Sequence, residues 1–110
     1  MEGKEKIKTV EGITFNYEKD GVQLRKQIEK RILSSTGTWA TLMVRHQDLD
    51  RTSGEFKDPR VTLARFKKTG GVWKKQNSFN INTREQASSI VQNIISMFGL
   101  TQEEIEPSEE

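Results

Sequence analysis

Residues 60–77 are Arg-Val-Thr-Leu-Ala-Arg-Phe-Lys-Lys-Thr-Gly-Gly-Val-Trp-Lys-Lys-Gln-Asn. The pair Gly70-Gly71 separates two runs rich in β-branched and aromatic residues, a pattern typical of two antiparallel strands joined by a tight turn. No acidic residue occurs in this stretch, and the interval 59–84 holds seven basic residues. The sequence therefore predicts a basic β-hairpin, around which the other elements are arranged.

The segments before the hairpin predict two more strands and one helix. Apolar and polar residues alternate over 12–17 and over 38–47, as in half-buried strands. Between them Asp20 is a possible helix N-cap, and apolar residues recur every fourth position up to about Ser35. We expect a helix there, an exposed loop over 48–59, and a fifth short strand over 78–81.

The second predicted helix follows the hairpin. Asn82 and Thr83 are alternative N-caps, because Glu85 or Gln86 lies three residues further on, and Gly99 is a C-terminal stop. An apolar stripe runs along this helix, formed by Ala87, Ile90, Val91, Ile94, Ile95 and Phe98. The stripe must pack on the sheet or on a second copy of the chain.

The fold class expected from these elements is α+β, with an antiparallel sheet of four to five strands and two helices in the order β-α-β-β-β-(β)-α. We expect a flexible N-terminus over 1–11, one α+β domain over 12–100, and a disordered acidic tail over 101–110. The tail carries five acids and no base, so residues 1–100 hold +7 of charge although the chain as a whole has +2. This excess favours an anionic partner.

Catalytic and metal chemistry have little support in this sequence. It contains no cysteine and one histidine, His46, for which a structural role is expected, either hydrogen-bonded or exposed at the edge of its strand. Asp48, Asp50 and Glu55 lack the spacing of a calcium loop, and no phosphate-cradling glycine motif occurs. We expect no catalytic residue, no metal and no cofactor; a small metal-dependent enzyme using these three acids is the least favoured alternative.

Strand alternation predicts how the side chains divide between the two sheet faces. If Ala40, Leu42 and Val44 face the helices together with Val61 and Leu63, the opposite face is both aromatic and basic. That opposite face would hold Trp39, Met43, Arg45, Arg60, Thr62, Phe66 and Lys68. On the next strand either Trp73 and Lys75 or Lys74 and Gln76 would join it.

Such a face suits single-stranded nucleic acid, which offers a charged backbone and flat bases. The candidate binding residues are Trp39, Arg45, Arg60, Arg65, Phe66, Lys67, Lys68, Trp73, Lys74 and Lys75. The alternative for Phe66 and Trp73 is a place in the core. The alternative for the whole face is a protein-interaction or dimerisation surface with a lysine rim.

The segment from about Trp39 to Phe98 resembles the single-stranded-DNA-binding family of the transcriptional coactivator positive cofactor 4, which is structurally akin to the plant Whirly proteins. The resemblance lies in the Arg- and aromatic-rich strand 61–68, the glycine hairpin, the basic strand 73–75, the segment 79–83 and the C-terminal helix. It implies a curved sheet and a homodimer. Ile90, Val91, Ile94 and Phe98 would then serve packing and dimerisation, while Arg65, Lys67, Trp73, Lys74 and Lys75 would contact DNA.

Partners and location are expected to follow from the same features. Single-stranded DNA or RNA is the expected ligand. For the acidic tail 101–110 three alternatives stay open: it competes with the ligand for the basic groove, recruits a protein partner, or only keeps the chain in solution. The chain has no apolar signal core and no apolar run long enough to span a membrane. We expect it in the cytoplasm, at a nucleoid or at a viral replication site, and not secreted.

Overall fold

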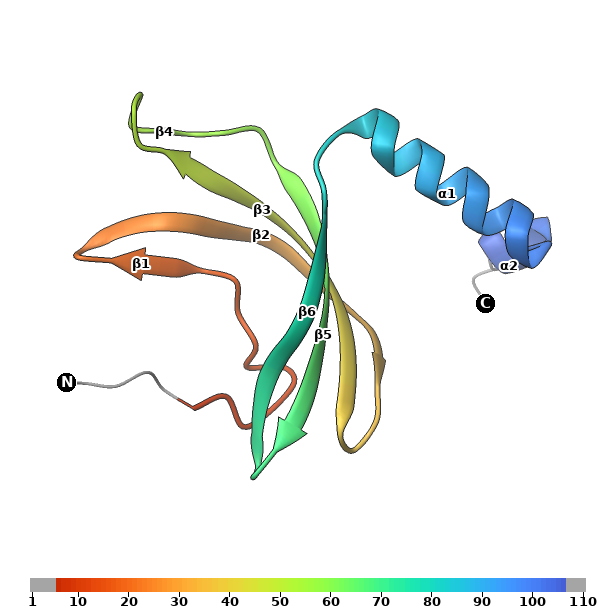
Figure 1. Cartoon of the computed structure of the whole chain (residues 1–110), viewed down its shortest axis with the longest axis horizontal. Helices are drawn as coiled ribbons and strands as arrows, with labels where there is room; N and C mark the ends of the chain where they lie inside the picture. Colours follow the sequence, from red (N-terminus) through yellow and green to blue (C-terminus); the bar gives the residue numbers. More distant parts are fainter. Residues whose placement is uncertain (1–5, 107–110) are drawn as a thin grey trace.

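One antiparallel sheet followed by two helices makes up the computed structural model, which describes residues 6–106. The sheet order is β1-β2-β3-β5-β6, with β4 paired to β3 at one end, and the sheet curls strongly (Figure 1). The elements are β1 (Tyr17–Lys19), β2 (Val22–Ser35), β3 (Trp39–Asp50), β4 (Glu55–Phe56), β5 (Arg60–Thr69), β6 (Val72–Ile81), α1 (Arg84–Phe98) and α2 (Gln102–Ile105). The predicted α+β class with a curved antiparallel sheet is confirmed.

The prediction of a helix from Asp20 to Ser35 is wrong, because this segment forms the long strand β2. Asp20 is not a helix cap. It and Gly21 both have positive φ, at 54° and 79°, and form the tight turn between β1 and β2. An Asp-Gly pair with this backbone is a strong hairpin former, and here it outweighs the capping preference of Asp.

Two bulges in β2 explain why its sequence looks helical. The register with β3 shifts between Gln27 and Glu29 and again between Ile32 and Ser34, so that Ile28 and Leu33 are the extra residues. Each bulge inserts one residue and moves the alternation by one position. Apolar residues that repeat every fourth position, as in a helix, therefore fit a strand that is interrupted twice.

The core lies on the inner face of the curled sheet, which we define by Ala40, Leu42, Val44, Ala64 and Phe66. Residues 6–16, which we call the strap, cover this face and contribute Ile13 and Phe15 to the core, with Ile7 and Val10 packed against it. The strap runs across this face from β6 to β2. At β6, Trp73 donates its backbone N–H to the Ile7 carbonyl, and at β2 the Lys30 ammonium donates to the Ile13 carbonyl. The prediction of a flexible N-terminus is therefore wrong for residues 6–11; residues 1–5 lie outside the described part.

The register of β5 differs by one residue from the predicted one, so its side chains lie on the opposite faces from those predicted. Ala40 pairs with Phe66, Leu42 with Ala64, and Val44 with Thr62, and directly paired residues share a face. Phe66 and Thr62 therefore point inward, and Val61 and Leu63 point outward. A shift of one residue moves every side chain of a strand to the other face, which makes this the largest correction to the predicted site.

The remaining loops and termini are more ordered than expected. β3 extends to Asp50 and pairs with β4, so only 51–54 and 57–59 of the predicted loop are irregular. The predicted fifth strand 78–81 is continuous with β6. α2 forms over Gln102–Ile105 with a capping box at Thr101, which corrects the prediction of a disordered tail for that part; residues 107–110 lie outside the described part.

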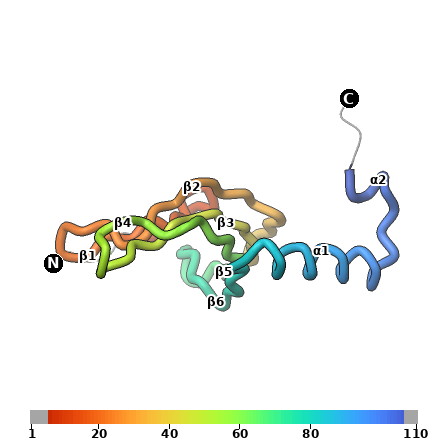
Figure 2. Tube along the Cα trace, turned by 90° about the horizontal axis from the view of Figure 1, so that it is seen from above, coloured from red at the N-terminus to blue at the C-terminus, as the bar shows by residue number. Residues whose placement is uncertain are grey.

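The helix α1 is confirmed with its predicted caps. The Thr83 hydroxyl accepts from the backbone N–H of Gln86, and Gly99 adopts the left-handed conformation at the C-terminal end, with φ of 64°. The helix projects away from the sheet, and α2 lies at its far end (Figures 1 and 2). No residue of α1 is buried. The apolar stripe was predicted to pack on the sheet or on a second copy of the chain. Within residues 6–106, it does not pack on the sheet.

Candidate nucleic-acid interface

The outer face of the sheet carries a cluster that we call the outer basic patch: Trp39, Arg65, Lys67 and Lys74. Trp39 is the direct partner of Lys67, and Lys67 is the direct partner of Lys74 on β6. The Arg65 guanidinium carbon lies 4.3 Å from the centre of the Trp39 ring, and the Lys67 ammonium lies 5.5 Å from it. Both contacts are within cation–π range. One half-buried indole thus has two cations beside it at the hairpin end of the sheet.

Like charges face each other in this patch. Lys67 and Lys74 are cross-strand neighbours on one face, and opposed like charges destabilise a strand pair. Within residues 6–106 no carboxylate forms an ion pair with either lysine or with Arg65. An anionic ligand would relieve this repulsion.

An apolar zone occupies the middle of the outer face. Met43 pairs with Leu63 and Leu63 pairs with Phe79, so their side chains form a row across β3, β5 and β6. The Phe79 side chain is 53% exposed. Phe79 is not among the binding residues predicted from the sequence. Its face depends on the register shift between Arg65 and Phe66, where β6 has the extra residue Gln76.

The predicted site residues divide between the two faces. Trp39, Arg45, Arg65, Lys67 and Lys74 lie on the outer face, whereas Arg60, Phe66, Lys68, Trp73 and Lys75 lie on the inner one. Phe66 and Trp73 are 6% and 5% exposed and belong to the core. Neither can stack on a base, which corrects that part of the prediction. Lys75 is directed toward the Phe15 ring, 5.9 Å from its centre.

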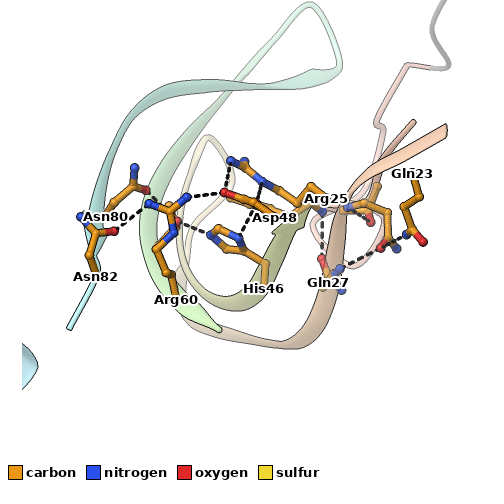
Figure 3. A network of polar contacts seen from close by, with 12 residues as sticks. Gln23, Arg25, Gln27, His46, Asp48, Arg60, Asn80 and Asn82 are labelled. Carbon is orange, nitrogen blue, oxygen red and sulfur yellow. Dashed lines mark hydrogen bonds and ion pairs between the residues drawn. The ribbon is translucent and has the colours of Figure 1, made fainter. Parts of the chain in front are cut away.

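Arg60 and His46 belong to a polar network that crosses the sheet (Figure 3). The His46 ring is buried and has a partner at each nitrogen: Asp48 Oδ1 at 3.2 Å from Nδ1 and Thr62 Oγ1 at 2.7 Å from Nε2. Asp48 forms ion pairs with Arg25 and Arg60. Of the two predicted alternatives for His46, the structure thus has the hydrogen-bonded ring and not the edge-exposed one.

Burial and the charges of this network together shift the pKa values of Asp48 and His46. Burial would raise the pKa of Asp48, but the hydrogen bond and charge of Arg25, then those of Arg60, outweigh it and hold the pKa at about 2. Burial also lowers the pKa of His46, with the charge of Arg25 acting in the same direction and Asp48 opposing it. At neutral pH Asp48 is thus ionised and His46 neutral.

A metal centre would need clustered donors. In the part of the chain that the structure describes, no group of three His, Cys, Asp or Glu side chains is placed to hold a metal ion. Asp48 is instead held by two arginines, and Asp50 accepts the backbone N–H of Thr52.

A helix that crosses a membrane must be long and strongly apolar. Among residues 6–106, no helix is long and apolar enough to cross a membrane.

The predicted dimerisation residues lie on the exposed side of α1. Val91, Ile94 and Phe98 are 54%, 46% and 78% exposed, whereas Ile90 is partly buried. Met97, which was not predicted, is more exposed than any of them. From Gln86 to Gln102 the chain carries no charged residue. A projecting helix that carries no charge after its first two residues, with large apolar side chains in solvent, is typical of an interaction surface.

Comparison with known proteins adds no assignment. No family model, curated protein or solved structure matches this chain. The resemblance to the positive cofactor 4 family therefore remains a prediction from the sequence, and the function is argued from the outer face and α1 alone.

Proposed function

We propose that this chain is a nonenzymatic binding protein for single-stranded nucleic acid, DNA foremost, and that the outer basic patch is its binding surface. The observation that supports this most is the placement of Trp39 beside Arg65, Lys67 and Lys74 without a pairing carboxylate among the described residues. Cations then contact phosphates and the indole stacks on a base. Stacking of this kind contributes about 1 to 3 kcal/mol per base with little sequence preference.

Duplex DNA is a poorer match to this surface. The aromatic ring lies on a sheet between cations, and the neighbouring apolar row ends in the half-exposed Phe79 ring. Bases reach rings on a sheet only when they are unstacked and unpaired. The outer face is thus suited to a strand whose bases are free.

The hairpin itself provides a matched test of which face binds. Lys67 and Lys74 point outward, and their sequence neighbours Lys68 and Lys75 point inward. The double variants Lys67→Gln/Lys74→Gln and Lys68→Gln/Lys75→Gln remove the same charge from the same two strands. Each is titrated against a labelled oligo-dT of about 20 nucleotides at several salt concentrations.

The outer double variant should lower the slope of log affinity against log salt by about 1.4, since each phosphate contact on a single strand contributes about 0.7. The inner double variant should leave that slope close to the wild-type value. Equal effects of the two variants would show that binding depends on net charge and not on this face. Failure of the wild-type chain to bind would favour the protein-interaction alternative.

A second proposal concerns the assembly: we infer that α1 pairs with α1 of a second copy to form a homodimer. Its 15 residues make a helix roughly 22 Å long, and isolated helices of this length are marginal in water. Its stripe is uncharged and apolar, so it is complementary to itself under two-fold symmetry. A copy of this chain is therefore the partner that fits best.

Ile94→Glu places a charge in the middle of the stripe and should give a monomer in sedimentation velocity, whereas the wild-type chain should sediment as a dimer. Ser89→Glu, on the opposite side of α1, is the control and should leave the dimer intact. A monomeric wild-type chain, or a dimer that persists in Ile94→Glu, would contradict pairing through α1.

A further inference from the structure

The far end of the outer face contains a hollow of about 550 Å³ that was not predicted. It lies where β3 and β5 meet the end of β6 and the first turn of α1. Its volume is within the range of small-ligand sites, about 300 to 1,000 Å³. The hollow is therefore large enough for one nucleotide.

The lining combines an apolar floor with a cationic rim. Val61, Ile81 and Ala87 come from β5, β6 and α1 and are all partly buried. Arg45 of β3 and Arg84 of α1 line the hollow, as does Arg60 of β5, whose guanidinium is turned to Asp48 on the inner face. Asp58 is the one acidic residue in the lining. An apolar surface beside arginines is suited to a flat base joined to a phosphate.

Two of the arginines, Arg45 and Arg84, have donors left for a ligand on the outer face. Arg60 does not count among them, because it donates to Asn82 Oδ1 at 3.1 Å and forms an ion pair with Asp48 on the inner face. Arg45 forms an ion pair with Glu29, with Nε 3.6 Å from Oε1, but its side chain is half exposed and its other N–H groups remain for a ligand.

The third arginine, Arg84, forms no ion pair with any residue from 6 to 106. Arg45 lies six residues along β3 from Trp39, a distance of roughly 20 Å on the same face. Between the two lies the apolar row that ends in Phe79. The outer face thus has cations at both ends and apolar side chains in the middle.

We propose that this hollow is a second subsite for the bound strand and holds one nucleotide, with its phosphate on Arg45 and Arg84 and its base against Val61 and Ile81. The inference rests on the proposed function and extends it: the strand crosses the whole outer face, from Trp39 to the start of α1. Arg84 becomes a nucleic-acid contact that lies outside the basic hairpin.

Arg84→Gln tests the subsite, with Arg51→Gln as a control of equal charge change in the exposed turn after β3. For labelled oligo-dT of about 20 nucleotides, Arg84→Gln should lower the salt slope by about 0.7 and Arg51→Gln should not change it. In a methyl-labelled sample, oligo-dT should shift the signals of Ile81 and Ala87 through the ring current of the base.

The outcomes separate the two proposals. Binding by the wild-type chain with an unchanged slope in Arg84→Gln and unmoved Ile81 and Ala87 methyl signals would overturn the subsite and leave the outer basic patch standing. A reduced slope without methyl shifts would overturn the placement of the base. No binding by the wild-type chain would overturn the proposed function, and the subsite with it.

Discussion

Replacing Asp48 by Asn should remove a contribution to folding stability that the wild type has at neutral pH and loses in acid. Asp48 lies on the inner face between Arg25 and Arg60, and its side chain is only 17% exposed. A folded pKa of about 2 instead of 3.8 corresponds to about 2 kcal/mol of folding free energy, because each tenfold change in proton affinity is worth about 1.4 kcal/mol. Asp48→Asn should therefore be less stable than the wild type by about that amount at neutral pH.

The sign of the pH dependence follows from the lowered pKa. The unfolded chain takes up a proton on Asp48 at a higher pH than the folded chain does, so the contribution of Asp48 is full above about pH 5 and is lost as pH falls toward 2. His46 acts earlier. Its pKa is also lowered in the folded state, so the wild type should begin to lose stability below about pH 6.5.

Urea unfolding followed by tryptophan fluorescence, repeated from neutral pH to about pH 2.5, measures both effects. The free energies of the wild type and Asp48→Asn should differ most at neutral pH and converge at the acid end. Asp58→Asn, which removes an exposed carboxylate from the neighbouring loop, should follow the wild-type profile. Parallel curves for the wild type and Asp48→Asn would refute the idea that the two arginines hold this carboxylate.

Three further predictions concern stability and are checked by chemical or thermal unfolding. Trp73→Ala should cost about 3 to 5 kcal/mol because the ring is buried, and a cost below about 1 kcal/mol would place it on the surface. Phe15→Ala should cost about 3 kcal/mol or more and expose the strap to protease, and protection equal to the wild type would contradict its anchoring role. Gly99→Ala, at a φ of 64°, should cost about 1 to 2 kcal/mol and weaken amide protection in the last turn of α1; unchanged protection would argue against the left-handed cap.

The parts of the fold that could be predicted have local causes. The Gly70-Gly71 turn and the helix with its Thr83 and Gly99 caps each depend on a few neighbouring residues, and both are confirmed. The Asp20-Gly21 turn has an equally local cause, but Asp is also a common helix cap. The apolar spacing that follows favoured the helical alternative only because two bulges hide the strand period.

The faces of the sheet could not be predicted, because they depend on register. The sequences of β3 and β5 alone do not determine whether Ala40 pairs with Phe66 or with a neighbour of Phe66. A shift of one residue would exchange the two faces of β5. The strap covers one of the two faces and makes it the inner one. Ile13 and Phe15 cover the face that carries Ala40 and Ala64, whose small side chains leave room for them. Half of the predicted site was thereby moved inward.

Fluorescence anisotropy of labelled oligo-dT tests most directly whether the outer face binds single strands through cations and a stacked ring. With the wild-type chain, affinity should fall steeply with salt, and unlabelled duplex DNA should fail to displace the oligonucleotide. Trp39→Ala should weaken binding by about 1 to 3 kcal/mol while leaving the salt slope unchanged, because it removes stacking and no charge. Absence of binding at low salt, or equal displacement by duplex DNA, would contradict this mode of binding.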